Sequence, residues 1–401
     1  MIRHLLKLVW NRKRANALIL VEIFFTFLVV FAVGTLGLFL WDNARRPLGF
    51  DWQDVWAVRV NMQAGSDDTF TAEQVETAAR LVREVETLAP VEAVTGAMME
   101  PFAFGQYTSG RTVNGRRVSM SVNEVTASFA EVMRFDVVRG RWFQPADAAL
   151  AWRPVVIDED LAREAWGEED PIGRRLGDPD PKSPEPERRV IGVVRDFRHH
   201  GELSGPDNFV FYHKRLGHPQ DRPPRVLLVR VRPGTPVAFE EELTRRLQAV
   251  AHEWSFEIAP LAQTRESAFR LRLTPLLVGG IVAFFLLLMV ALGLLGVLWQ
   301  NLLQRTREIG LRRAIGASRA EVHRQIILEQ LLLTTLGVLL GTIVVIQLPV
   351  LDVFGSVLRP QVFGSGLLSA SVAMYLLATV CALYPSTLAG RVQPAEALRY
   401  E

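Results

Sequence analysis

The chain has 401 residues, of which 49% are hydrophobic and 22% charged, and its 45 basic side chains nearly balance its 43 acidic ones. Four windows of 24 or 25 residues contain only two charged side chains, Glu22 and Glu329. This uneven distribution excludes an ordinary soluble globule, and the balanced total argues against a general nucleic-acid-binding protein. The windows are residues 17–41, 275–299, 326–350 and 367–390.

Each window is long enough to cross a membrane as a helix. At 1.5 Å per residue, a 25-residue helix reaches roughly 37 Å, against about 30 Å of hydrocarbon. The first window is longer than a signal-peptide core and no small-x-small cleavage site follows it, so we interpret it as an uncleaved anchor. Before it, residues 1–16 place apolar side chains at helical spacing among basic ones, which predicts an amphipathic helix on membrane lipid. A plain basic flank is the alternative.

The short loops decide the predicted orientation. Residues 1–16 carry five basic and no acidic side chains, and residues 300–325 carry six arginines against two glutamates, whereas the loop 351–366 has one base and one acid. Because basic loops stay in the cytoplasm, we predict that both termini, including the tail 391–401, and the segment 300–325 are cytoplasmic. Residues 42–272 and the loop 351–366 are then on the outer side.

Residues 42–272 are predicted to form a large extracytoplasmic α+β domain with two lobes, inserted between the first and second spans, because strands and helices alternate irregularly along them. A Thr-x-x-Gln capping box predicts a helix that starts at Thr71, and Asn114-Gly115 predicts a two-residue hairpin turn. The only cysteine, Cys381, lies in the last window, so no intrachain disulfide stabilises this domain. Strands are expected at residues 55–60, 154–157, 189–195, 209–212, 225–231 and 256–259, and a second long helix at 237–252.

Signals for catalysis, cofactor binding or metal binding are weak. No G-x-x-x-x-G-K-[ST] phosphate-binding loop occurs, so we expect this chain neither to hydrolyse nucleotides nor to bind a cofactor. No G-x-S-x-G nucleophile elbow occurs either, and we assign no catalytic residue. Four outer-domain histidines match no zinc-ligand spacing, and we interpret them as surface side chains rather than metal ligands: His199, His200, His213 and His218.

Residues inside or beside the spans point to helix packing. The glycines of Gly279-Gly280 and of Gly364-Ser365-Gly366 are predicted to let helices approach closely. Glu22 and Glu329 lie near the cytoplasmic ends of the first and third spans, where a carboxylate costs less than at mid-bilayer. For both acids we favour a role in helix packing or dimer contact over a proton relay.

The most informative segment is residues 304–330, QRTREIGLRRAIGASRAEVHRQIILEQ. Gln304–Ile315 has the composition of a helix, and Glu308 stands four residues before Arg312, the order that favours an ion pair. We therefore predict a short basic helix after the second span.

The residues that follow predict a sharp turn. Gly316 is a C-terminal helix stop, and Ser318 with Glu321 forms a capping box that starts the next helix, which continues into the third span. A short helix joined rigidly to a transmembrane helix can transmit force at the membrane surface. The alternative is an arginine-rich loop that only sets the topology and has no partner.

These residues carry a resemblance to a known family. The run RTREIGLRRAIGASRAEV at residues 305–322, with the tail PAEALRYE at 394–401, closely resembles the permease subunits of MacB/FtsX-type ABC transporters. The segments FDVVRGRWFQPAD (135–147), DPIGRRL (170–176) and VIGVVRDF (190–197) resemble that family's extracytoplasmic core domain. The likeness covers essentially the whole chain: one span, a large outer domain and three spans.

The resemblance implies a permease subunit in the bacterial cytoplasmic (inner) membrane, paired with a second permease copy or paralogue. It also implies an ABC ATPase that binds ATP and Mg, and because the sequence begins just before its first span, we expect that ATPase on a separate chain. In this family the segment between the second and third spans is a coupling helix seated on the ATPase. By position the coupling helix falls on Arg307, Glu308, Ile309, Gly310, Arg312, Arg313, Ala314, Ile315 and Gly316.

The implied function is mechanotransmission, in which ATP-driven movement of the ATPase reaches the outer domains. The most favoured outcome is export of a substrate from the periplasmic side, with a periplasmic adaptor protein and an outer-membrane channel as further partners. The alternatives are FtsX-like activation of an extracytoplasmic cell-wall hydrolase and extraction of lipoproteins. A membrane-anchored enzyme would need a catalytic group that the sequence does not show.

Overall fold

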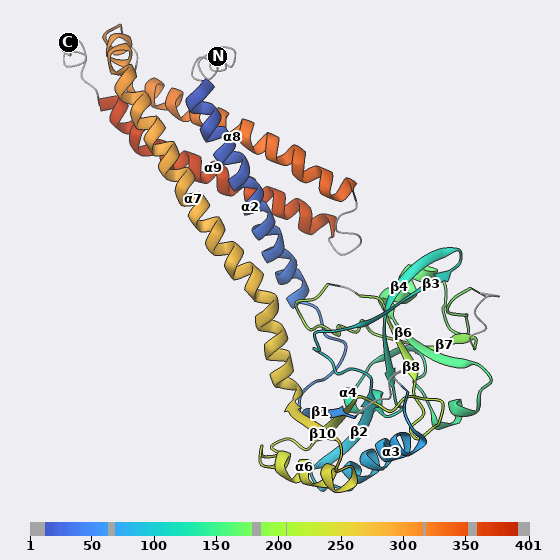
Figure 1. Ribbon diagram of the computed structural model, residues 1–401. Helices are drawn as coiled ribbons and strands as arrows, with labels where there is room; N and C mark the ends of the chain where they lie inside the picture. Colours follow the sequence, from blue (N-terminus) through green and yellow to red (C-terminus); the bar gives the residue numbers. More distant parts are fainter. Residues whose placement is uncertain are drawn as a thin grey trace. The chain divides into compact units, whose positions relative to one another are not determined.

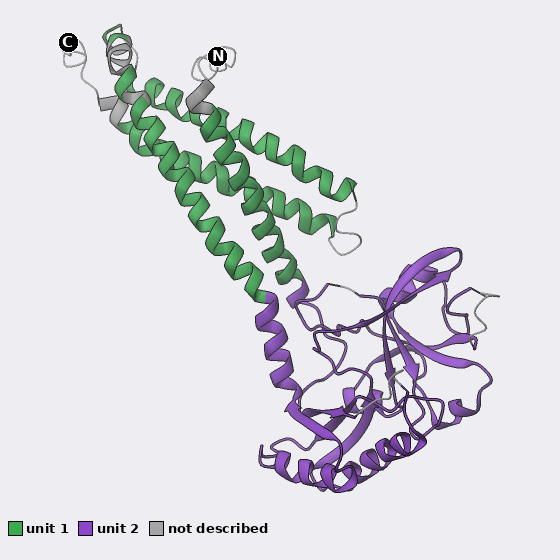
Figure 2. Ribbon diagram, viewed as in Figure 1, with its two compact units in different colours: residues 1–42, 273–401 green, residues 43–272 purple. Residues whose placement is uncertain are grey.

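The computed structural model describes residues 13–62, 69–178, 186–205, 207–315, 318–351 and 359–391. The chain divides into two compact units, a membrane unit of residues 1–42 and 273–401 and an outer unit of residues 43–272 (Figure 2). The predicted N-terminal helix before residue 13, the outer loop at 352–358 and the tail from residue 392 lie outside the described residues.

The described part of the membrane unit contains four helices that are long and apolar enough to cross a membrane. Their apolar segments are Ala17–Ala44, Leu261–Gln300, Arg319–Val350 and Pro360–Thr387. The prediction of four spans with the large domain between the first and second is therefore confirmed. The helices, labelled in Figure 1, are α2 (Lys13–Ala44), α7 (Leu261–Ala314), α8 (Arg319–Val350) and α9 (Pro360–Arg391).

Helix α2 packs against the three other helices of the membrane unit. Four of its side chains, each one turn after the last, are buried: Ile19, Ile23, Phe27 and Phe31. They share one apolar cluster with residues of α7, α8 and α9, namely Val290, Leu294, Val338, Val345, Ala370, Met374, Ala378 and Cys381.

Glycines let α2 approach its neighbours closely. A Cβ atom at Gly337 would lie 2.5 Å from Cγ2 of Ile23, and one at Gly341 would collide with the ring of Phe27. Of the glycines predicted for packing, Gly279 lies against Val33 and Gly366 against Thr35.

Two other glycines of the spans make no such contact within the described residues. A Cβ atom at Gly280 or at Gly364 would meet no described atom within 4 Å. Each neighbours a packed glycine in sequence, but a step of one or two residues turns a helical position by about 100° or 200°, away from the contact face.

The outer unit is built on one mixed sheet, which has ten strands in its described residues. The strand order is β10-β1-β9-β2-β4-β8-β6-β7-β5, and β3 pairs with β4. Most neighbours are antiparallel, whereas β4–β8 and β6–β7 are parallel. The strands are β1 (Val55–Asn61), β2 (Val91–Ala97), β3 (Tyr107–Val113), β4 (Arg116–Val125), β5 (Val137–Gly140), β6 (Arg153–Asp158), β7 (Arg188–Val194), β8 (Phe209–His213), β9 (Val226–Val231) and β10 (Ser255–Pro260).

Two apolar clusters on the sheet define what we call its two lobes; residues 43–272 form one compact unit, so the predicted division into two lobes stays a prediction. The first lobe packs β1, β2 and β9 against α3 (Ala72–Glu86) and α6 (Phe239–Val250), which lie together on one side of the sheet in Figure 1. The second lobe packs β4, β6, β7 and β8 against α5 (Glu159–Trp166). Between the lobes, β2 and β4 share a single register pair, Ala97 with Val125, and a third apolar cluster fills the junction. The remaining short elements are α4 (Phe129–Met133) and the 3-10 turn Pro145–Ala149.

Local sequence signals explain several of these elements. Thr71 caps α3 through its hydroxyl, which accepts from the Gln74 N–H, and the Gln74 side chain accepts from the Thr71 N–H. Asn114 and Gly115 have φ angles of 51° and 74°, the left-handed pair that a tight hairpin turn requires. The expected strands and both long helices of the outer domain are present within one to three residues of their predicted bounds.

The segment after the second span differs from the prediction of a separate short helix. α7 is one helix of 54 residues, and the predicted basic helix is its last part. The only proline inside α7 is Pro275. Beyond it no residue forces a break, because a lone glycine such as Gly310 costs only about 1 kcal/mol relative to alanine.

Candidate functional site

Two helices, α2 and α7, join the outer unit to the membrane unit, and both are fastened within the outer unit. β10 pairs with β1 and runs directly into α7, so that Pro260 ends the strand and Leu261 begins the helix. The Leu261 side chain is fully buried in the apolar cluster between the lobes. The start of α7 is therefore part of the outer unit's core.

Arg59 on β1 connects the sheet to the first turn of α7. Its guanidinium donates to Glu100 and to Glu257, each at 2.6 Å, and its Nη2 lies 3.5 Å from the Thr264 hydroxyl. Burial works against the charge of Arg59, but the hydrogen bonds and charges of the two glutamates outweigh it and raise the pKa of Arg59. The guanidinium thus stays ionised and holds three segments together.

Arg265, one turn further along α7, makes a second attachment. Its Nε donates to Glu202 at 2.5 Å, and its guanidinium lies 4.6 Å from the centre of the Trp52 ring. An ion pair and a cation–π contact on one side chain fix both its position and its orientation.

Arg198 fastens the end of α2. Its guanidinium donates to the backbone carbonyls of Asn43, at 2.6 Å, and of Ser204, and its own N–H donates to Leu48. The side chain is buried, and burial, followed by the nearby charge of Arg46, lowers the pKa of Arg198. A cation that caps terminal helix carbonyls also interacts favourably with the helix dipole.

None of these three arginines was singled out from the sequence. Arg59 is 41 residues from Glu100 and 198 from Glu257, so no local pattern marks the pairs. Arginine is abundant along the whole chain, so the local arginine content could not mark these three residues as functional.

The opposite end of α7 is where the coupling residues were predicted. The side chains of Arg307, Glu308, Ile309, Gly310, Arg312 and Arg313, and all of Gly316, lie outside the described residues. The backbone of α7 continues through this stretch to Ala314. Among the described residues, Leu311, Ala314 and Ile315 are exposed, and Ile315 is exposed to 79%.

The next helix begins immediately after the turn. Ser318 caps α8: its hydroxyl accepts from the Glu321 N–H at 3.2 Å, and the Glu321 carboxylate accepts from the Ser318 N–H at 2.9 Å. α7 and α8 are thus separated by only four residues, 315–318.

The two acids in the spans occupy different settings. Glu22 lies against α7, where a Cβ atom added to Gly293 would be 2.7 Å from its Oε2. Glu329 accepts a hydrogen bond from Gln325 on its own helix at 3.0 Å. Their predicted role in packing or dimer contact stays a prediction.

One of the four histidines, His199, differs from the prediction of surface side chains, whereas His200, His213 and His218 are partly exposed. His199 is 2% exposed and stacks on Phe209, and burial lowers the pKa of His199 to about 3. The rings of Phe197 and Phe209 contact the His199 ring and cover it. The spacing of the histidines in the sequence does not show this burial. Within the described residues no group of three potential ligands could hold a metal ion.

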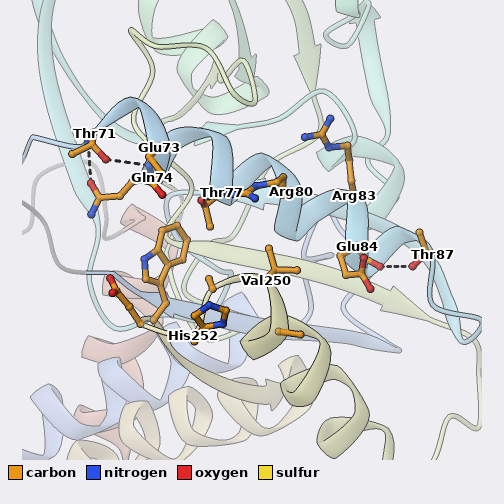
Figure 3. A pocket seen from close by; sticks show the side chains of 14 residues that line it. Thr71, Glu73, Gln74, Thr77, Arg80, Arg83, Glu84, Thr87, Val250 and His252 are labelled. Carbon is orange, nitrogen blue, oxygen red and sulfur yellow. Dashed lines mark hydrogen bonds between the residues drawn. The ribbon is translucent and has the colours of Figure 1, made fainter.

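A groove of about 1010 Å³ lies between α3 and the segment that follows α6 (Figure 3). Its lining is polar and carries both signs of charge. The basic side chains are Arg80 and Arg83, and the acidic ones are Glu73, Glu84 and Glu253. The groove therefore selects neither an anionic nor a cationic ligand.

Comparison with known proteins identifies both units. The model of the MacB-like periplasmic core domain matches residues 17–246, more than half of the chain, and that of the FtsX-like permease C-terminal domain matches residues 280–394. The periplasmic region of MacB from Actinobacillus actinomycetemcomitans has a TM-score of 0.38 at 15% identity and covers 54% of this chain and 92% of that chain.

Curated relatives agree with the family models. The chain is 26% identical over 323 residues to the macrolide export ATP-binding/permease protein MacB of Bordetella avium, which covers 78% of this chain and 48% of that protein. It is 26% identical over 295 residues to the pyoverdine export ATP-binding/permease protein PvdT of Pseudomonas savastanoi pv. phaseolicola, which covers 68% of this chain and 42% of that protein. The chain thus spans about half the length of the curated relatives it matches. It belongs to the MacB/FtsX-type family of ABC transporter permeases, as the resemblance in its sequence indicated.

Proposed function

We propose that this chain is a permease subunit that converts the ATP-driven movement of a separate ATPase subunit into movement of its outer domain. ATP and Mg bind to that ATPase and not to this chain. Two permease copies, or this chain and a paralogue, assemble in the bacterial cytoplasmic membrane with their termini in the cytoplasm. The movement exports a substrate from the periplasmic side, and a periplasmic adaptor and an outer-membrane channel complete the path.

One observation carries this proposal: α7 is continuous from the outer sheet to the predicted ATPase contact. It begins directly after β10, is held there by Arg59 and Arg265, and continues to Ala314. A continuous helix passes a displacement along its axis, because its hydrogen bonds repeat at every residue. The exposed Ile315 at its end suits a protein partner better than water.

The names of the relatives support the direction of transport. The two curated relatives above are both called export ATP-binding/permease proteins. Both names join the ATP-binding and permease functions, and the present chain matches about half of each protein's length.

The experiment tests the end of α7 against a matched surface change. The full chain is purified with each candidate ABC ATPase, and complex formation and ATP hydrolysis are measured for wild type, Ile315→Asp, Glu308→Lys and Val237→Asp. Val237 is 70% exposed on the outer unit, far along the chain from the coupling segment. We expect Ile315→Asp and Glu308→Lys to lose the complex and the stimulated hydrolysis, and Val237→Asp to keep both. Unchanged binding and hydrolysis in the first two variants would refute the proposed contact.

A further inference from the structure

A second pocket of the outer unit lies where three neighbouring strands meet the loop that follows β8, and its volume is about 310 Å³. Strands β4 and β8 are parallel and end together, since Val125 pairs with His213. β6 is the other neighbour of β8, and the two are antiparallel, so β6 begins at this same end (Figure 1). The 3-10 turn Pro145–Ala149 and residues 215–222 supply the remaining walls. The pocket therefore lies entirely within one compact unit.

Hydrogen bonds hold the walls of this pocket in place. The Asp221 carboxylate accepts from the N–H of Arg215 and from its guanidinium, at 2.8 to 3.1 Å. The Asp147 carboxylate accepts from the Gln144 N–H and from both Nη atoms of Arg141, at 2.6 to 2.8 Å. A lining that is held before a ligand arrives loses less conformational freedom when the ligand binds.

The charges of the lining leave a cation for a ligand. Glu124 lies 2.8 Å from the Nζ of Lys214, whose side chain is 1% exposed, and the arginines just named neutralise Asp147 and Asp221. Each acid of the lining is thus already paired with a base. Arg153, the first residue of β6, also lines the pocket, is exposed to solvent, and makes no ion pair with any acid in the described part of the chain. A free guanidinium of this kind is a preferred partner of a carboxylate.

His213, the last residue of β8, adds a polar group. The register of Val155 with Tyr212 places the start of β6, and so Arg153, beside this end of β8. The imidazole of His213 stacks on the Phe143 ring, with the ring centres 5.0 Å apart, and has no hydrogen-bond partner among the residues that the structure describes. Burial lowers the pKa of His213 more than the nearby carboxylates raise it, so the ring is neutral at pH 7 and keeps one N–H donor.

Another part of the lining is apolar. It includes Trp152, which is partly buried, and Leu150, which is 38% exposed, together with Ala148, Ala151, Pro154 and Pro186. Small-molecule sites combine such apolar walls with a few polar groups that fix the orientation of the ligand. Arg153 would repel a cation, and an inorganic anion would leave the apolar wall unused. An aromatic ring that carries a carboxylate uses both parts of the lining.

We propose that this pocket binds a small aromatic carboxylate, with the carboxylate at Arg153 and His213 and the ring against Trp152 and Leu150. The proposal does not rest on the proposed function. Binding is measured without an ATPase or an adaptor, so either proposal can fail while the other stands.

Fluorine NMR with two probes of opposite charge tests the site. The probes are 4-fluorobenzoate and 4-fluorobenzylamine, which share a ring and differ in the sign of their charge. Each probe is titrated with the full-length chain in phosphatidylcholine nanodiscs, and empty nanodiscs correct for partition into lipid. Line broadening is recorded for wild type, Arg153→Ala, Arg153→Lys, His213→Phe and, as the matched control, Arg116→Ala. Arg116 is an exposed arginine at the turn between β3 and β4 and does not line the pocket.

We expect saturable broadening of 4-fluorobenzoate and none of 4-fluorobenzylamine. The loss of one charged hydrogen bond should raise the Kd of 4-fluorobenzoate about tenfold in Arg153→Ala. The rise should be smaller in Arg153→Lys, which keeps the charge, and in His213→Phe, and Arg116→Ala should bind as wild type does.

Three results would overturn the proposal: no saturable binding of 4-fluorobenzoate, equal binding of the two probes, or equal affinity in Arg153→Ala and Arg116→Ala. Because Arg153 is exposed, its replacement should leave the fold intact, and the melting temperature of each variant checks this. If His213→Phe fails to fold, the two Arg153 variants still decide the outcome.

Discussion

The guanidinium of Arg265 lies over the ring of Trp52 while its Nε donates to Glu202, so that one side chain of α7 is held from two sides of the outer unit. Replacing it should weaken the attachment without touching the ATPase contact. We expect Arg265→Ala to keep ATP hydrolysis in the assembled complex, to lose most of the outer-domain movement, and to lower the stability of the outer unit by about 1–2 kcal/mol. Arg270→Ala is the control, because Arg270 is exposed on the same helix and pairs with Glu266 at its surface. Equal effects of the two variants would contradict the assigned role of Arg265.

Packing of α2 through glycine gives a second test. Gly337→Val should drive a methyl group into Ile23, whereas Gly280→Ala should be tolerated because a Cβ there meets no described atom. Overpacking costs about 1–3 kcal/mol, so the melting temperature in detergent should fall for the first variant and stay unchanged for the second. A fall of the same size in both would contradict the role of the Gly337 contact, since helix propensity alone favours alanine and valine over glycine.

The buried Arg198 should be more costly to replace than an exposed arginine. In Arg198→Met the carbonyls of Asn43 and Ser204 lose their donor, and an unsatisfied buried group costs about 1–3 kcal/mol. We expect the end of α2 to loosen, which hydrogen exchange at residues 43–48 measures. Arg195→Met serves as the comparison, since Arg195 is half exposed and lies 3.9 Å from Asp136. Exchange that rises equally in both variants would remove Arg198 from the attachment of α2.

His199 predicts a pH dependence of the stability. Its pKa is about 3 in the folded state and near the ordinary value of 6.5 when unfolded. Between these values the unfolded chain binds the extra proton, so the free energy of unfolding should fall as the pH is lowered from 6.5 towards 3, by at most about 1.4 kcal/mol per pH unit. Below the folded pKa no further loss follows from this group.

Other carboxylates also titrate in this range, so the slope is compared between variants. Denaturant unfolding of His199→Phe should show a shallower loss with falling pH than wild type, while His252→Phe, an exposed histidine after α6, should keep the wild-type slope. If His199→Phe keeps the slope as well, His199 does not cause it.

The sequence predicted the elements whose signals are local. The capping boxes of Thr71 and Ser318 and the Asn114-Gly115 turn each depend on residues within three positions, and each is present in the structure. β2 at Val91–Ala97 was missed, since it lacks a strict alternation of apolar and polar residues and its partners, β9 and β4, are distant in sequence. The same reason hid the attachments at Arg59, Arg198 and Arg265, whose partners come together only when the two lobes fold.

The continuity of α7 was also not predictable from composition. The change from apolar to basic residues near Leu303 marks the edge of the membrane, but a change of solvent does not end a helix. α7 is continuous even through Pro275, which lacks a backbone donor.

The most direct test of the account is a break in α7 between its apolar segment and its end. Leu303→Pro removes a helix hydrogen bond and disrupts the helix at a cost of about 3 kcal/mol, whereas Leu303→Ala keeps it. A fluorophore on Val237→Cys in the Cys381→Ser background reports movement of the outer unit when ATP is added to the complex with the ATPase. We predict that Leu303→Ala moves as wild type does, and that Leu303→Pro still binds the ATPase and hydrolyses ATP but gives no fluorescence change. An undiminished change in Leu303→Pro, with hydrolysis and binding intact, would contradict transmission through α7.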